Sequence, residues 1–184
     1  VTGTGDTRST ADLLAAILTA AGRHVGLAAG RRVFSGGRRV GREKHAAPAA
    51  ARMILLDPEV DVAVLELRPR DVLRHGLGCD AIDVTVVVDE LPEEQSAERQ
   101  LRPATPLLLD AIRVVARSTR SVIYACHSDP ATAAIAADAG QARLCRVVPA
   151  PAGRTPAAAA VARGERAVQR GRTIRLQNGA RDQG

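Results

Sequence analysis

Aromatic residues are almost missing from this 184-residue chain, which contains Phe34, Tyr124 and no tryptophan. Sites for single-stranded nucleic acid stack bases on aromatic side chains, so the composition argues against that class of function. The core must be built from alanine, valine, leucine and isoleucine instead. Hydrophobic residues make up 46% of the chain, which is enough for one sizeable globular domain.

Long apolar runs and regularly spaced cysteines are missing too. No stretch approaches the ~20 apolar residues of a membrane span, and no signal-peptide pattern is present, so we expect no membrane association and a cytoplasmic location. The three cysteines form no CxxC pair, and the four histidines show no HExxH or other metal-ligand spacing. These spacings predict free thiols and no zinc centre.

Lysine occurs only once, at Lys44, so arginine supplies almost all of the positive charge behind the net charge of +6. A basic protein can present a surface for nucleic acid. The arginines are scattered along the chain, however, and do not gather on one predicted helix face. This scattering argues against a nucleic-acid partner, because binding to phosphates needs many positive charges on one surface.

Apolar residues alternate between helical and strand periodicity along the chain. We expect helices at 10–21, 48–55, 72–76, 106–117 and 130–139. We expect strands at 24–28, 61–67, 82–88, 121–125 and 142–148, hairpins at 32–40 and 166–176, a loop at 91–103 and a polar tail at 177–184. Strands that alternate with helices predict an α/β fold with a mainly parallel sheet flanked by helices.

A candidate site follows from this topology, because parallel sheets bind ligands beyond the carboxyl ends of their strands. The rule places the loop at 3–10, Glu66, the pair Asp89-Glu90 and residues 126–129 along one rim of the sheet. We therefore expect any functional site at this rim.

The first ten residues, VTGTGDTRST, form the most informative motif. A glycine-containing turn that leads into a helix is typical of a phosphate-binding loop, but the lysine that such loops carry is missing. The same residues could also be an ordinary glycine turn in which Ser9 or Thr10 caps the helix.

The loop resembles VTGTNGKTTT, which opens the central, ATP-binding domain of Mur ligases. Residues 51–66 resemble the stretch ARMVLRDPRVDAAVLE, and residues 72–80 resemble ILRRGLGFD, in the Mur-ligase-like half of cyanophycin synthetases. The closing hairpin at 166–176 falls where that group has RAVYLRDGQIVL. The resemblance covers residues 1–176 and implies a P-loop-type Mur ligase central domain with a truncated first strand.

Such ligases use ATP and Mg²⁺ to phosphorylate a carboxylate, and an amine then attacks the acyl phosphate. The resemblance implies nucleotide contacts from Gly3, Thr4, Gly5, Arg8, Ser9 and Asp129. It implies magnesium ligands at Ser9 and Glu66, although Glu66 could instead be a solvated carboxylate. The implied partners are ATP and either other ligase domains or a full-length ligase homologue. No residue is assigned as catalytic.

Several chemical positions depart from the family pattern. Without gaps, Asp6 replaces a glycine and Thr7 replaces the loop lysine, whereas one inserted residue puts Arg8-Ser9 at the Lys-Thr position. Glu94 stands where the family has a metal-binding histidine, and Asp110 stands where it has a later lysine. The scaffold matches while the chemistry does not. We therefore expect a ligase-lineage domain with a degenerate phosphate loop and impaired catalysis, and the alternative is a non-catalytic interaction or scaffold module.

Overall fold

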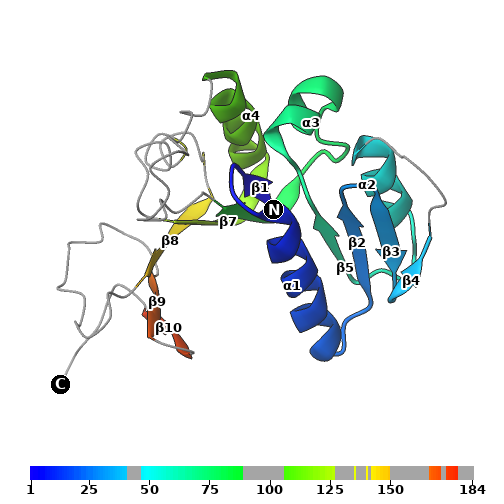
Figure 1. The fold of residues 1–184 in the computed structure, drawn as a ribbon, viewed down its shortest axis with the longest axis horizontal. Helices are drawn as coiled ribbons and strands as arrows, with labels where there is room; N and C mark the ends of the chain where they lie inside the picture. The colour runs from blue at the N-terminus through cyan, green and yellow to red at the C-terminus, as the bar shows by residue number, and fades with distance from the viewer. Residues whose placement is uncertain are drawn as a thin grey trace, which may run out of the picture.

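The structure is a computed structural model, and it describes residues 1–40, 47–88, 106–126, 135, 140, 142–149, 166–170 and 173–177. The helices are α1 (Thr7–Ala20), α2 (Ala47–Leu55), α3 (Pro69–His75) and α4 (Pro106–Arg117). The strands are β1 (Thr2–Gly3), β2 (Val25–Ala29), β3 (Arg32–Ser35), β4 (Arg38–Arg39), β5 (Val62–Leu65), β6 (Ile82–Val88), β7 (Thr119–Cys126), β8 (Arg143–Pro149), β9 (Arg166–Arg170) and β10 (Thr173–Gln177) (Figure 1).

The strands form two hydrogen-bonded sets within the described residues, ordered β1-β6-β7-β8-β9-β10 and β4-β3-β2-β5. From β1 to β9 each neighbouring pair is parallel, and β10 turns back antiparallel on β9. In the other set β2 and β5 are parallel, and the β3–β4 hairpin covers one edge. The prediction of an α/β fold with a mainly parallel sheet and two small hairpins is therefore confirmed.

β1 joins the two sets. The nitrogen of Val1 donates to the carbonyl of Leu65 at 2.8 Å, and the amide of Leu67 donates to the carbonyl of Val1 at 2.8 Å. This alternation is the hydrogen-bond pattern of a parallel pair, so β5 lies beside β1. On its other side β1 pairs with β6, with Thr2 opposite Val87. β1 therefore lies between β5 and β6, in the combined strand order β4-β3-β2-β5-β1-β6-β7-β8-β9-β10.

Helices α1 and α2 pack against different residues of the β2 and β5 strands. Val25, Leu27 and Ala29 of β2 pack with Ala11 and Ala15 of α1. Ala28, between them in sequence, packs instead with Ala50 and Ile54 of α2. Because successive side chains of a strand point to opposite faces, the two helices cover opposite faces of this sheet. Small residues in both helices allow a close approach without aromatic side chains.

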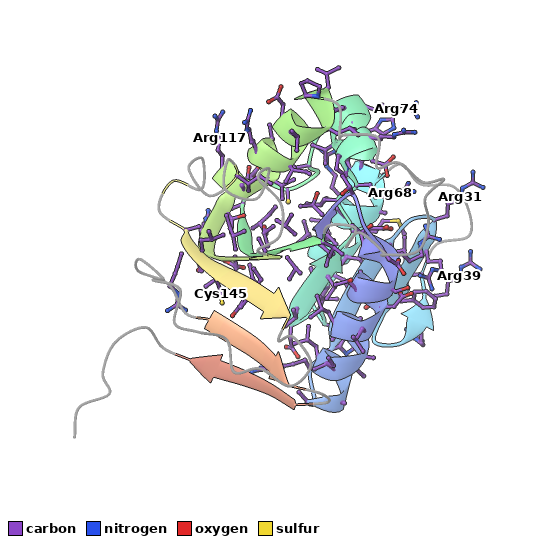
Figure 2. The ribbon with its side chains drawn as sticks, turned by 60° about the vertical axis from the view of Figure 1, so that its left-hand side comes forward. Arg31, Arg39, Arg68, Arg74, Arg117 and Cys145 are labelled. Carbon is purple, nitrogen blue, oxygen red and sulfur yellow. The ribbon has the colours of Figure 1, made fainter. Side chains whose placement is uncertain are left out.

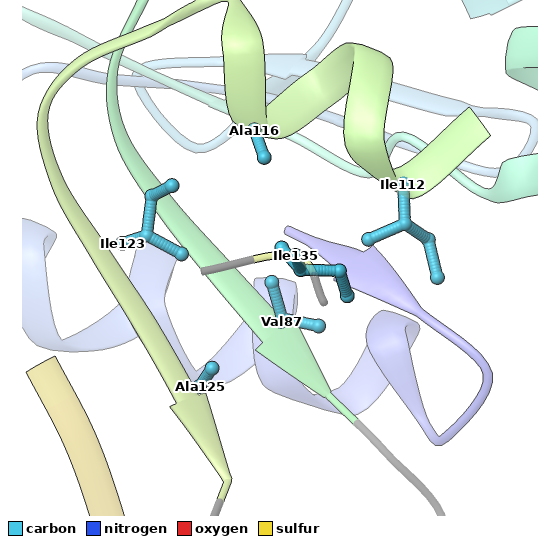
Figure 3. Close-up of a cluster of buried hydrophobic side chains, with 6 residues drawn as sticks. All are labelled: Val87, Ile112, Ala116, Ile123, Ala125 and Ile135. Carbon is cyan, nitrogen blue, oxygen red and sulfur yellow. The ribbon is translucent and has the colours of Figure 1, made fainter. Parts of the chain in front are cut away.

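A second core lies under α4. Figure 3 shows Ile112 and Ala116 of α4 facing Val87 of β6 and Ile123 of β7. Ile123 and Ala116 are completely buried, and Ile112 and Val87 are nearly so. α3 joins this region through a neighbouring cluster in which Val72 packs with Ala111 and Val115 of α4. Aliphatic packing thus holds α4 on β6 and β7, and the end of β6 lies beside the loop.

Two helices begin three residues earlier than the sequence pattern predicts. α1 begins at Thr7 instead of residue 10, because the side chain of Asp6 caps it. α3 begins at Pro69 instead of residue 72, since proline suits the first turn of a helix. β10 includes Gln177, the first residue of the expected tail. The expected loop at 91–103, and the expected helix at 130–139 apart from Ile135, lie outside the described residues.

Surface arginines are spread over several elements, as expected. Figure 2 shows Arg31 and Arg39 near the β3–β4 hairpin, Arg74 on α3 and Arg117 at the end of α4. Cys79 and Cys145 form no disulfide within the described residues. None of the helices that the structure describes is both long and apolar enough to cross a membrane.

Candidate functional site

The glycine loop at residues 3–10 begins at the carboxyl end of β1, and its first residues contact the end of β6 closely. Gly3 has a φ of +133°, and a Cβ atom there would overlap the backbone carbonyl oxygen of Val88. The amide of Gly5 donates to that same oxygen at 2.9 Å. Only glycine can satisfy both the positive φ and the close approach at position 3. The loop therefore lies at the carboxyl end of β1, at the rim predicted from the sequence.

Amide groups of the loop donate to acceptors within the protein. Besides the bond from Gly5 to Val88, the amide of Thr7 donates to the carbonyl of Gly5 at 2.8 Å. The amide of Ser9 donates to the Asp6 carboxylate at 3.0 Å. In phosphate-binding loops, amides at the helix N-terminus point at the phosphate. Here a carboxylate of the chain itself occupies one of those positions.

The carboxylate of Asp6 is held in its charged form. Hydrogen bonds from the hydroxyl and the amide of Ser9 lower the pKa of Asp6 below its ordinary value of 3.8. Asp6 is exposed at the surface. At neutral pH it therefore places a permanent negative charge at the N-terminus of α1, where the helix dipole would otherwise attract a phosphate.

Glu66 follows β5 and lies beside the first turn of α1. Its side chain is 2% exposed, and the hydroxyl of Thr7 donates to Oε1 at 2.8 Å. The other oxygen, Oε2, is buried and accepts no hydrogen bond from any residue that the structure describes. The interpretation of Glu66 as a solvated carboxylate is therefore wrong, because the β1–β5 pairing carries it inside.

Arg8 supplies the positive charge beside this carboxylate. Its Nε lies 3.9 Å from Oε2 of Glu66. The guanidinium also lies over Gly30, which follows β2 and has a φ of +58°, and a Cβ atom on Gly30 would overlap Nη2 of Arg8. The missing side chain at position 30 thus makes room for the arginine.

A small hollow opens next to Glu66 between the β2–β5 sheet and α2. Its lining includes Ala28, Gly30, Ala50, Leu67 and Asp71. Asp71 is engaged by Arg68, whose Nε and Nη2 lie 2.7 and 2.6 Å from its Oδ2. Of the two acidic side chains that line this hollow, Glu66 is therefore the one with a buried oxygen that accepts no hydrogen bond from the described residues.

The arrangement can be compared with what ATP and magnesium would require. A triphosphate needs the loop amides and a cation, whereas here the amides of Gly5, Thr7 and Ser9 are already bonded and Asp6 repels phosphate. Magnesium prefers oxygen ligands and Glu66 offers one, but the guanidinium of Arg8 faces that same oxygen. Within the described residues, no group of three or more histidine, cysteine or acidic side chains could hold a metal ion. As arranged here, the described residues of the loop and Glu66 do not fit a magnesium triphosphate.

The structure brings together most of the site residues inferred from the sequence. Four of them lie near the carboxyl end of β1, namely Gly3, Gly5, Arg8 and Glu66. Thr4 is exposed in the same loop. Ser9, an inferred magnesium ligand, is exposed and bonds Asp6, while Thr7 contacts Glu66. Asp129, Glu94 and the pair Asp89-Glu90 lie outside the described residues.

Sequence reasoning did not anticipate the role of Gly30. The available signal is a glycine immediately after a buried strand, which often marks a close approach by another group. The partner of that approach, Arg8, lies on a different element and has no local sequence link to Gly30. Sequence reasoning also missed Asp71 beside the site, since its pairing with Arg68 looks like an ordinary surface contact.

The chain is similar to known proteins both in sequence and in fold. Cyanophycin synthetases from Geminocystis herdmanii, Crocosphaera subtropica and Synechocystis sp. are each 38% identical to this chain over 89 residues. The matched stretch covers 48% of this chain but only 10% of each relative. No protein-family model matches the chain.

Among solved structures, a UDP-N-acetylmuramoyl-L-alanyl-D-glutamate–2,6-diaminopimelate ligase superposes with a TM-score of 0.63 at 12% identity. The superposition covers 91% of this chain and 33% of that protein. An identity this low establishes the fold alone. The chain thus has the fold of part of a Mur ligase and is similar in sequence to a segment of the cyanophycin synthetases, as the motifs of its sequence indicated.

Proposed function

We propose that this chain is an ATP-binding-type central domain of the Mur ligase and cyanophycin synthetase lineage whose hold on ATP is weak and whose ligase chemistry is impaired. One observation carries the proposal: the carboxylate of Asp6 accepts a hydrogen bond from the amide of Ser9 at the N-terminus of α1. A phosphate would have to displace a hydrogen-bonded anion from that position. The missing lysine removes the charge that would compensate for this cost.

Partners follow from the same lineage. The matched relatives are much longer than the matched stretch, which supports a domain that works with other ligase domains or beside a full-length ligase homologue. In such an assembly the loop and Glu66 would lie beside a nucleotide that the other ligase domains help to bind. Our proposal assigns no catalytic residue to this chain.

The test is isothermal titration with ATP and Mg²⁺ on the wild-type chain and on a rebuilt loop. The rebuilt variant carries Gly5→Asn, Asp6→Gly, Thr7→Lys and Arg8→Thr, which restores the family loop. It should bind ATP at least about tenfold more tightly than the wild type, equivalent to ~1.4 kcal/mol. The new lysine and the loss of the repulsion from Asp6 both contribute to this gain.

Two further variants isolate the cause. Asp6→Asn keeps a side chain that can cap the helix but removes the charge, so it should strengthen binding in part. Asp12→Asn removes a negative charge further along α1, where Asp12 pairs with Arg32 at 2.7 Å, and should leave binding unchanged. If the wild type already binds ATP as tightly as the rebuilt loop, or turns it over while forming an amide, the proposal is wrong.

A further inference from the structure

The environment of Glu66 requires a compensating positive charge. The carboxylate is buried, one oxygen accepts from Thr7, and Oε2 accepts no hydrogen bond within the described residues. An ionised carboxylate that is removed from water without a partner is strongly unfavourable. A positive charge close to Oε2 would offset this cost.

Arg8 is placed to supply that charge. Its guanidinium approaches Oε2 of Glu66 to 3.9 Å and packs over Gly30. A Cβ atom at position 30 would overlap the present position of Nη2 of Arg8, so glycine leaves room for this placement of the guanidinium. The neighbouring acid, Asp71, is already paired with Arg68 and does not compete for Arg8. Arg8 is also half exposed, with 47% of its side chain open to solvent, so it shields the carboxylate from one side only.

We propose that Arg8 is a built-in substitute for a divalent cation at Glu66. The arginine keeps the carboxylate neutralised without metal, so the wild-type chain does not bind Mg²⁺ or Mn²⁺ at this position. Removing the guanidinium leaves the Glu66 carboxylate beside a small hollow, and Mg²⁺ can bind through a single carboxylate when water supplies its other oxygen ligands. Position 8 thus decides whether this site uses a metal.

The experiment measures the melting temperature and Mn²⁺ binding of the full chain without nucleotide. Its outcome is therefore independent of whether the chain binds ATP. Arg8→Ala should melt below the wild type in EDTA and should regain at least about 2 °C with millimolar Mg²⁺, an amount that corresponds to ~1 kcal/mol in a chain of this size. By electron paramagnetic resonance, Arg8→Ala should take up Mn²⁺ while the wild type does not.

Matched variants separate this effect from unspecific ion binding. The double variant Arg8→Ala/Glu66→Gln should lose the response to both metals, since the carboxylate ligand is gone. Arg8→Lys keeps a positive charge and should resemble the wild type. Arg32→Ala, which frees the exposed Asp12 on the same helix, should gain no metal site. If Arg8→Ala does not fold, Arg8→Gln removes the charge while keeping most of the side-chain length, and it should bind Mn²⁺ instead.

Two results would overturn the proposal. One is a wild-type chain that binds Mn²⁺ and loses that binding in Glu66→Gln. The other is a folded, uncharged variant at position 8 that binds no Mn²⁺ and shows no stabilisation by Mg²⁺.

Discussion

Thr7 donates a hydrogen bond of 2.8 Å to Glu66, and this buried contact links the first turn of α1 to the end of β5 across 59 residues of sequence. In the ungapped alignment Thr7 stands where the family has its loop lysine. In this chain the side chain at position 7 bonds inward to the protein.

Replacing Thr7 with valine should lower the free energy of unfolding by about 1–3 kcal/mol. Valine has nearly the same shape but no hydroxyl, so Oε1 of Glu66 would lose its buried donor. Chemical denaturation monitored by circular dichroism measures the change. Thr7→Ser retains the hydroxyl and is the control. Equal losses in the two variants would mean that packing of the methyl group, and not the hydrogen bond, makes position 7 important.

Gly3→Ala should destabilise the chain more than Gly37→Ala does. Both glycines have positive φ, so both substitutions introduce backbone strain. Only at Gly3 would the new Cβ meet backbone atoms of Val88, whereas Gly37 faces open space. We expect a difference of about 1–3 kcal/mol in the free energy of unfolding, as for other overpacked sites. Similar values for both variants would show that β1 and β6 can separate without cost.

Asp57 should contribute to loss of stability in acid. Its pKa is lowered from 3.8 by the hydroxyl of Ser35, which donates at 2.6 Å, and by the amide of Glu59. A depressed folded-state pKa contributes stability that is present above the ordinary pKa and is lost as pH falls through the lower value. Asp57→Asn keeps an acceptor but cannot titrate, so its melting temperature should fall less than that of the wild type below pH ~4. Parallel decreases in the two proteins would contradict this assignment.

Elements with a continuous local pattern were predictable from the sequence. The helix expected at 106–117 and the strand expected at 82–88 coincide with α4 and β6, because a long apolar segment between polar ones can be recognised from the local sequence. The first residue of α1 was harder to predict from the sequence, since Asp6, Ser9 and Thr10 are all suitable capping residues. Only the geometry shows that Asp6 caps the helix by accepting from Ser9.

The candidate site was predictable in place but not in its internal contacts. A parallel sheet puts Glu66 and the loop at one rim, and both lie there. The burial of Glu66 depends on the pairing of Val1 with Leu65 and Leu67, which no local pattern encodes. The contact of Arg8 with Gly30 likewise depends on the packing of α1 beside the end of β2.

The joining role of β1 has a consequence for the order in which the chain folds. β1 has only two residues, and its partners lie far along the chain, with Thr2 opposite Val87 and Val1 beside Leu65. Closing such long loops costs entropy before any contact compensates for it. The strand that precedes both its partners in the sequence must therefore wait for β5 and β6 to be synthesised. The helix-capping contact between Asp6 and Ser9 is local and can form at once, so the first turn of α1 can form before the sheet beside it exists.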